Sequence, residues 1–103
     1  MFSVTVLYPK TDTSRFDMDY YLNQHTPLVR ERLTPVGLTG IDLKESIAGG
    51  APGTVQAYTM ITQLNFSSLE DLQNALATPG PELIGDIPNF TDVQPQMQIS
   101  RSV

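Results

Sequence analysis

The side chain best suited to chemistry in this sequence is His25, the only histidine among 103 residues. An imidazole has an ordinary pKa of about 6.5, so it can take up or release a proton near neutral pH. Other groups able to exchange a proton beside an apolar ligand are the tyrosines Tyr8, Tyr20, Tyr21 and Tyr58. These residue types indicate acid–base chemistry on a bound molecule. The alternative for His25 is a core histidine, bonded to backbone, that stabilises a bend in its helix.

Three further polar residues could assist such chemistry. Asp86 and Asn89 belong to a predicted loop, 85–94, and a carboxylate there could orient the imidazole, as a third group orients the base in other active sites. The same two residue types also favour turns, because their side chains mimic backbone turns, and this alternative stays open. Arg32 borders the apolar face of a predicted helix, where it could bind an anionic group of a substrate.

Composition excludes several other chemistries. Without cysteine, the chain has no disulfide, thiolate zinc site or cysteine nucleophile, and one histidine excludes a multi-histidine metal site within one subunit. No dinucleotide-binding fingerprint occurs, and we expect neither metal nor cofactor. The formal net charge of −5 argues against nucleic acid, which requires a basic face. No apolar run approaches the roughly 20 residues that span a bilayer. The first residues alternate like a strand rather than forming the apolar run of a signal peptide. We therefore expect a cytoplasmic protein without membrane contact.

The hydrophobic period then locates the elements that must position these groups. Residues 2–8 alternate, as a strand does, whereas residues 16–33 follow a helical period. The predicted inner arc of this helix contains Met18, Tyr21, Leu22, His25, Leu28, Val29, Arg32 and Leu33. Pro27 lies inside the helix and lacks an N–H group, which predicts a kink near residues 24–26.

The remaining chain supplies three strands and one more helix. The predicted elements are a strand over 38–47, a strand over 54–66, a helix over 69–77 capped by Ser67 or Ser68, a helical turn within 82–88 and a strand over 93–101. The order β-α-β-β-α-β is typical of a ferredoxin-like sandwich, an α+β fold with both helices on one face of an antiparallel sheet. We therefore predict one domain over residues 1–103.

Two of the predicted strands, 38–47 and 54–66, carry apolar residues on both sides. In the second, one side presents Val55, Ala57 and Ile61, and the other Tyr58, Met60 and Leu64. An antiparallel sheet with one face in water alternates more cleanly. We therefore predict that a second subunit covers the free face with its own sheet, which makes the protein a homodimer. A chain of this length also has little room for a deep internal site of its own.

Two motifs resemble the signatures of a known family. The segment Tyr20–Val29, YYLNQHTPLV, resembles the Y-Y-x-x-x-H-x-P-L signature of the EthD family, named after a protein encoded alongside ethyl tert-butyl ether degradation genes. Residues 85–95, GDIPNFTDVQP, resemble its C-terminal signature, and 4–9 fit its opening. The resemblance covers essentially the whole chain and implies a dimeric α+β barrel built from two ferredoxin-like sheets. Relatives on this fold include cofactor-free isomerases, cyclases, dehydratases, quinol-type monooxygenases and haem-binding proteins.

The function predicted from residues and resemblance together is a homodimeric, cofactor-independent enzyme acting on a small apolar or aromatic metabolite. Its reaction would be a proton transfer, as in isomerisation, dehydration or decarboxylation, in a pocket between helix 16–33 and the sheet. The candidate catalytic residues are His25, Tyr21 and Asp86, and the candidate substrate-binding residues are Tyr8, Leu22, Leu28, Arg32, Tyr58, Met60 and Phe90. Two alternatives remain: a non-catalytic binding or accessory protein of a degradation pathway, and a haem protein with His25 as axial ligand.

Overall fold

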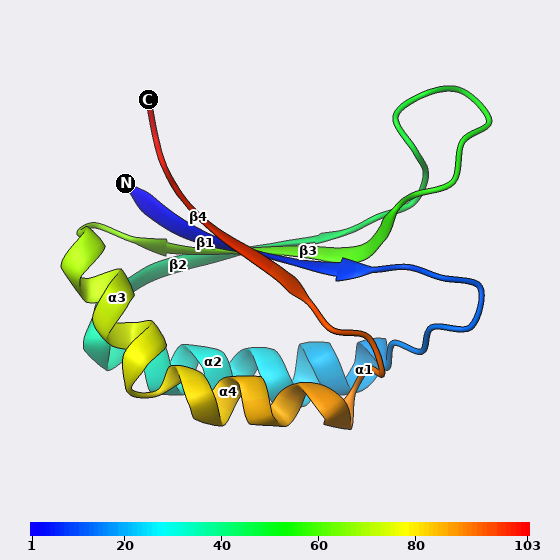
Figure 1. Cartoon of the computed structure of the whole chain (residues 1–103). Helices are drawn as coiled ribbons and strands as arrows, with labels where there is room; N and C mark the ends of the chain where they lie inside the picture. Colours follow the sequence, from blue (N-terminus) through cyan, green and yellow to red (C-terminus); the bar gives the residue numbers. More distant parts are fainter.

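Four antiparallel strands form a single sheet in the computed structural model, which describes residues 1–103. They are β1 (Phe2–Pro9), β2 (Leu38–Glu45), β3 (Tyr58–Phe66) and β4 (Gln96–Arg101), in the spatial order β2-β3-β1-β4. The helices lie together on one side of this sheet (Figure 1). This confirms the predicted α+β, ferredoxin-like fold. No helix combines the length and the apolar character that crossing a membrane requires.

The helical layer consists of two antiparallel stretches. The first runs through α1 (Met18–Tyr20), a π-helical segment η1 (Tyr21–His25), α2 (Thr26–Leu33) and a 3₁₀ turn η2 (Thr34–Val36). The second runs through α3 (Leu69–Ala77), α4 (Gly80–Asp86) and a 3₁₀ turn η3 (Ile87–Asn89). The helix predicted over 69–77 is confirmed as α3, whereas the helical turn predicted within 82–88 is longer than expected, since α4 and η3 together cover 80–89. The predicted N-cap of α3 is confirmed at Ser68, whose hydroxyl accepts a hydrogen bond from the Asp71 backbone N–H.

The irregularity predicted near residues 24–26 takes the form of a π turn. The helix begins at Met18 rather than at 16, because the Asp17 carboxylate caps it by accepting from the Tyr20 N–H. Farther along, the Thr26 N–H bonds to the Tyr21 carbonyl, five residues back instead of four. Pro27, which has no N–H to donate, follows directly, so proline marks the right place for a break in the α-helical bonding.

This π turn changes which side chains face the sheet. A regular helical period placed Leu22 and Arg32 on the inner arc, but both are exposed, Leu22 to 44%. That part of the prediction was wrong. Thr26, absent from the predicted arc, is buried beside His25. The physical reason is that five-residue bonding needs more residues per turn, which shifts the phase of the buried face by about one position.

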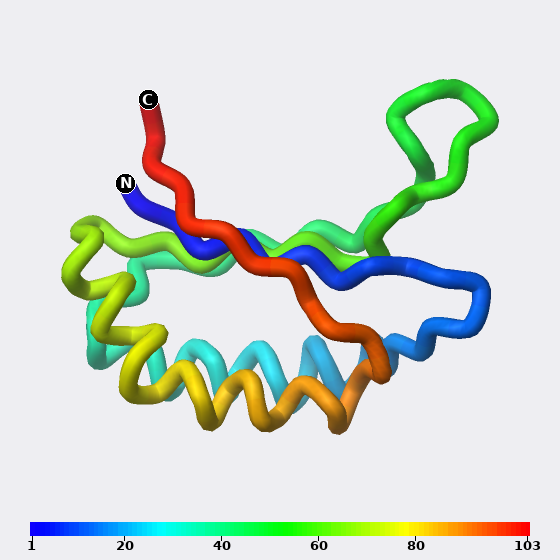
Figure 2. Tube along the Cα trace, viewed as in Figure 1, coloured from blue at the N-terminus to red at the C-terminus, as the bar shows by residue number.

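The strand ends also differ from the prediction. β2 ends at Glu45 and β3 begins only at Tyr58, so residues 46–57 form a loop that includes the predicted breaker cluster. Within this loop Gly53 has a φ of 76°, which glycine adopts without the strain other residues would meet. β4 begins at Gln96, not at 93, because Pro95 cannot donate a ladder hydrogen bond. The loop 46–57 projects from the sheet away from the helices, as the trace in Figure 2 shows.

The face of the sheet opposite the helices is more polar than predicted. Val55 and Ala57 lie in the loop 46–57, which leaves Ile61 and the cross-strand neighbour Leu7 as apolar members of this face. The rest of the face carries side chains that bond to one another: Ser3 to Asn65 at 2.8 Å, Gln63 to Ser3 at 3.2 Å and Asn65 to Asp42 at 3.1 Å. The expectation of two apolar faces was therefore wrong for most of β3.

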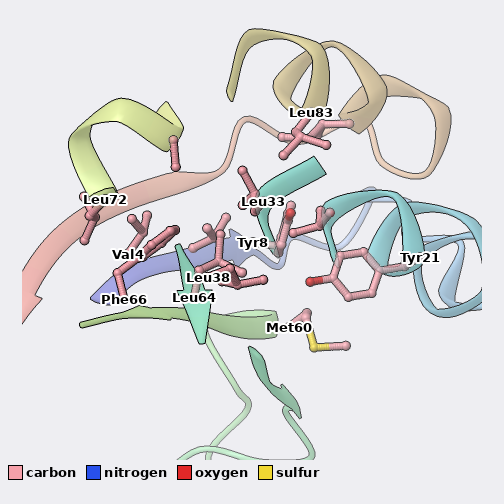
Figure 3. Close-up of a cluster of buried hydrophobic side chains, with 14 of the residues drawn as sticks. Val4, Tyr8, Tyr21, Leu33, Leu38, Met60, Leu64, Phe66, Leu72 and Leu83 are labelled. Carbon is pink, nitrogen blue, oxygen red and sulfur yellow. The ribbon is translucent and has the colours of Figure 1, made fainter. Parts of the chain in front are cut away.

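The hydrophobic core lies between the sheet and the helices. Cross-strand pairs such as Val4–Leu64 and Tyr8–Met60 form its floor. Figure 3 shows these side chains and those of Tyr21 and Leu83 directed toward one another between the two layers. This layer also holds the candidate site.

Candidate functional site

The two helical stretches bring His25 and Asp86 together. The imidazole Nδ1 lies 2.8 Å from Asp86 Oδ2, although the two residues are 61 positions apart in the sequence. His25 ends the π segment and is 5% exposed, and Asp86 ends α4. Asp86 thus belongs to a helix rather than to the predicted loop. His25 bonds to this carboxylate, which differs from the alternative in which it bonds only to backbone.

The Asp86 carboxylate is itself held by two neighbours. Its other oxygen, Oδ1, accepts from the Tyr20 hydroxyl at 2.8 Å and from the Asn89 side-chain amide at 2.9 Å. Burial by itself raises the pKa of Asp86, but the hydrogen bonds from His25, Asn89 and Tyr20 outweigh it and lower the pKa below the ordinary value. Asp86 is therefore ionised at neutral pH.

An ionised Asp86 decides which His25 nitrogen carries the proton. A carboxylate can only accept, so the Nδ1–H donates to it and the lone pair of a neutral imidazole lies on Nε2. No protein atom hydrogen-bonds to Nε2. Asp86 also stabilises the imidazolium that forms when Nε2 takes up a proton. The pair has the arrangement of a general base with its orienting carboxylate.

Aromatic rings fix the plane of the imidazole. The Tyr21 ring stacks on His25 with centroids 5.5 Å apart and an interplanar angle of 26°. The Phe90 ring, fully buried, lies 4.6 Å from His25 on centroids. Because both rings are packed in the core, His25 has little freedom to rotate away from Asp86.

His25 lines an apolar cavity of about 60 Å³ between the sheet and the helices. Its walls include Val4 and Val6 of β1, Val29 of α2 and Leu83 of α4, and no Asp, Glu, Lys or Arg contributes to them. Two lining residues, Ile84 and Met97, are 50% and 43% exposed, so we place the mouth between α4 and β4. A surface groove of about 600 Å³ shares Ile84 and Met97 with the cavity. The groove therefore adjoins the mouth of the cavity.

Four residues with hydroxyl groups also line this cavity: Tyr8, Tyr21, Thr26 and Thr62. The Tyr21 hydroxyl hydrogen-bonds to Thr62 Oγ1. Burial raises the pKa of Tyr21, and this effect outweighs the neighbouring hydroxyls of Thr62, Tyr8 and Thr26, which lower the pKa. Of these three hydroxyls, only that of Thr62 has hydrogen-bond geometry to Tyr21. Burial likewise raises the pKa of Tyr8. All four hydroxyls are therefore protonated at neutral pH and can donate hydrogen bonds.

Thr26 differs from the other three hydroxyls. The residue is 7% exposed, and its Oγ1 is the one buried side-chain oxygen or nitrogen of the chain that has no hydrogen-bond partner. An unpaired buried polar group of this kind costs about 1–3 kcal/mol.

The predicted site residues divide into three groups. Tyr8 and Tyr21 line the cavity with His25, whereas Asp86, Met60 and Phe90 pack near it without lining it. The others lie away from the cavity: Leu22 is exposed, Leu28 is half-buried, Arg32 bonds to Glu82 on the surface and Tyr58 bonds to Gln96. Tyr58 pairs with Pro9 beyond a register shift, which turns its side chain to the face opposite the helices.

Two cavity hydroxyls escaped the sequence prediction. Thr62 alternates with Met60 and Leu64, so the strand period contained the signal that it faces the helices. Thr26 had no such signal, because its burial depends on the π turn. The cavity residues of α4 and β4 were missed because their faces depend on how the second helical stretch docks.

The fold defines the class of protein: an α+β chain with a ferredoxin-like sheet, in which the His25 site lies between the sheet and the helices. Residues 9–94 match the EthD domain, and the chain belongs to the EthD family. An EthD-like protein from Ralstonia eutropha JMP134 is 35% identical, with a TM-score of 0.90, over 99% of this chain and 91% of that one.

More distant structures agree on the fold. An ethyl tert-butyl ether degradation (EthD) family protein from Bacillus halodurans C-125 is 22% identical with a TM-score of 0.78, over 100% of this chain and 99% of the other. HapK from Hahella chejuensis is 12% identical with a TM-score of 0.61, over 100% of this chain and 93% of the other. No curated protein matches the sequence.

Proposed function

We propose that this protein is a cofactor-independent enzyme that transfers a proton within a small apolar or aromatic metabolite. The observation that carries the proposal is the 2.8 Å hydrogen bond from His25 Nδ1 to Asp86, which leaves Nε2 as an unpartnered base beside an apolar cavity. Perturbed or oriented titratable groups lining an apolar pocket are typical of active sites.

In the proposed reaction His25 first acts as base and then as acid. Nε2 takes a proton from a C–H bond of the ligand, and Asp86 stabilises the resulting imidazolium. The proton is then returned at another atom of the ligand, which gives isomerisation, or is given to a leaving group, which gives elimination. Proton transfer by such a positioned group contributes about 10²–10⁴-fold to rate.

The experiment compares the parent protein with His25→Gln. Both are incubated in D₂O with a panel of cyclic ketones, and uptake of deuterium next to the carbonyl is followed by NMR. We expect exchange above the buffer rate for the parent and a loss of about 10²–10⁴-fold for His25→Gln. Far-UV circular dichroism serves as the control for folding. Equal exchange by folded His25→Gln would sink the proposal.

The proposed assembly is a homodimer in which a second copy covers the free face of the sheet. Two features support this assembly. The polar side chains of this face already bond to one another, so covering them leaves few hydrogen-bonding groups unsatisfied. The loop 46–57 also presents two apolar side chains to solvent, Ile47 at 89% and Val55 at 74% exposure. Analytical ultracentrifugation at micromolar concentration should give twice the monomer mass. A change of Ile61 to Lys on this face should return the mass to that of a monomer, whereas monomeric parent protein would contradict the proposal.

Haem binding through His25 is the alternative that this site favours less. Haem iron lies at the centre of a rigid macrocycle, so the whole macrocycle would have to enter the layer next to Nε2, where the cavity holds about 60 Å³. The remaining alternative, a binding protein without turnover, predicts ligand binding with no His25-dependent exchange in D₂O. The exchange experiment therefore separates the two functions.

A further inference from the structure

We infer that the reacting group of the ligand is a neutral carbonyl, whose oxygen accepts hydrogen bonds from Thr26 and Tyr21 while His25 takes a proton from the neighbouring carbon. The inference rests on the proposed function and extends it to the chemical class of substrate. It also assigns Thr26, which no motif indicated, as a binding residue.

The first observation is the unpartnered hydroxyl of Thr26. Buried hydroxyls are nearly always hydrogen-bonded, and Thr26 Oγ1 is the exception in this chain. Thr26 follows His25 directly and lines the same cavity. An oxygen atom of a ligand in this cavity would give Oγ1 the partner that the protein does not supply.

The second observation is the absence of charge around the cavity. Its walls contain no Lys, Arg, Asp or Glu. Arg32, which the sequence predicted could bind an anionic group, is bonded to Glu82 on the surface. A carboxylate or phosphate in this cavity would therefore lose its hydration without gaining a countercharge, which is strongly unfavourable. A neutral carbonyl avoids this penalty and still accepts two hydrogen bonds.

The third observation is the placement of donors and base around one space. Thr26, Tyr21 and Thr62 line the cavity together with His25, and Tyr21 stacks on the imidazole. When Nε2 removes the proton, the C–H bonding pair forms a C=C bond and the C=O π pair moves to oxygen, giving an enolate. Preorganised hydroxyl donors stabilise that negative charge. Where a C=C bond of the ligand is conjugated with this enolate, its far carbon takes the proton back from His25 while the C=C bond shifts by one position and the C=O bond re-forms. This completes an isomerisation without any oxidant or reductant.

The test uses 4-nitrophenol above its pKa, because the phenolate oxygen mimics the oxygen of the enolate. Its charge is delocalised over the ring and the nitro group, so burying it costs less than burying the localised charge of a carboxylate or phosphate. Its methyl ether, 4-nitroanisole, is the control ligand of similar shape without that charge. We expect Thr26→Val, which replaces the hydroxyl by a methyl of the same shape, to weaken binding of the phenolate about 10-fold or more and to leave the ether unchanged. Thr26→Ser, which keeps the hydroxyl, should bind the phenolate like the parent protein.

Stability provides the second measurement. Because Thr26 Oγ1 has no partner in the protein, Thr26→Val should melt at or above the parent temperature. A folding failure or a lower melting temperature in Thr26→Val, with Thr26→Ser unaffected, would mean that the hydroxyl has a structural partner, and this outcome overturns the inference. Equal phenolate binding by Thr26→Val and the parent, or no binding by either, overturns it as well. Exchange in D₂O that depends on His25 but not on Thr26 would refute this inference alone and leave the proposed function standing.

Discussion

The two faces of the sheet carry polar side chains in contrasting ways. On the face opposite the helices, Ser3, Gln63, Asn65 and Asp42 bond to one another in a row across three strands. On the helix side, the polar groups lie in an apolar layer, and Thr26 Oγ1 and His25 Nε2 have no protein partner. A network whose groups are satisfied suits contact with another surface, whereas unpartnered groups beside an apolar cavity suit a ligand.

The difference has a physical origin in strand alternation. Successive residues of a strand point to opposite faces, so Thr62 faces the cavity while Gln63 and Ile61 face away. One set of strands therefore supplies both a candidate active site and a candidate contact surface. Variants placed on one face should leave the other undisturbed, and the predictions below test this separation.

The largest effect should come from Asp86→Asn on the helix side. The neutral amide no longer stabilises an imidazolium at His25, so we expect deuterium exchange to fall by about 10²-fold or more. The measurement is the NMR exchange assay in D₂O, with circular dichroism as the folding control. A folded Asp86→Asn protein with parental exchange would show that Asp86 only supports the helix.

The same variant makes a prediction about acid stability. The folded protein lowers the pKa of Asp86, so its contribution to stability is present above the unfolded value of about 3.9 and is lost as pH falls through the folded value. Urea unfolding should therefore show Asp86→Asn to be less stable than the parent at pH 7, with the two curves converging in acid. A constant difference from pH 7 into acid would contradict the assignment of this shift to Asp86.

A smaller effect should come from Tyr20→Phe, with Tyr58→Phe as its matched control on the other face. The Tyr20 hydroxyl donates to Asp86 at 2.8 Å, whereas the Tyr58 hydroxyl donates to Gln96 at 3.1 Å. We expect Tyr20→Phe to slow exchange several-fold and to move the acid limb of the pH–rate profile upward, because the Asp86 carboxylate loses a donor. Tyr58→Phe should change neither property. Equal effects of the two variants would argue that they act through general stability.

The smallest effect should come from Arg32→Gln. Arg32 bonds to Glu82 on the surface, outside the cavity. We expect parental exchange rates in D₂O and parental affinity for 4-nitrophenolate, because exposed ion pairs contribute little and no ligand contact is lost. A reduced affinity specific to anionic ligands would instead support the predicted role of Arg32 in binding an anionic group.

The sequence by itself determined much of the fold and the identity of the candidate base. Local alternation, the Ser68 cap and the breakers around residues 48–53 depend on neighbouring residues, so their order predicted the α+β fold correctly. The residue counts likewise left His25 as the one imidazole, and the two motifs indicated the EthD family that the comparison confirmed. The order of elements and the single imidazole follow from short-range periodicity and composition, whereas the family follows from the resemblance of the two motifs.

Only the tertiary structure decided which groups share the site. The contact between His25 and Asp86 joins residues 61 positions apart and depends on how two helical stretches dock, which no local pattern encodes. The π turn placed Thr26 in the cavity and Leu22 on the surface, because five-residue bonding shifts the phase of the buried face. Packing over long range, rather than periodicity, therefore selected the hydroxyls that surround the single histidine.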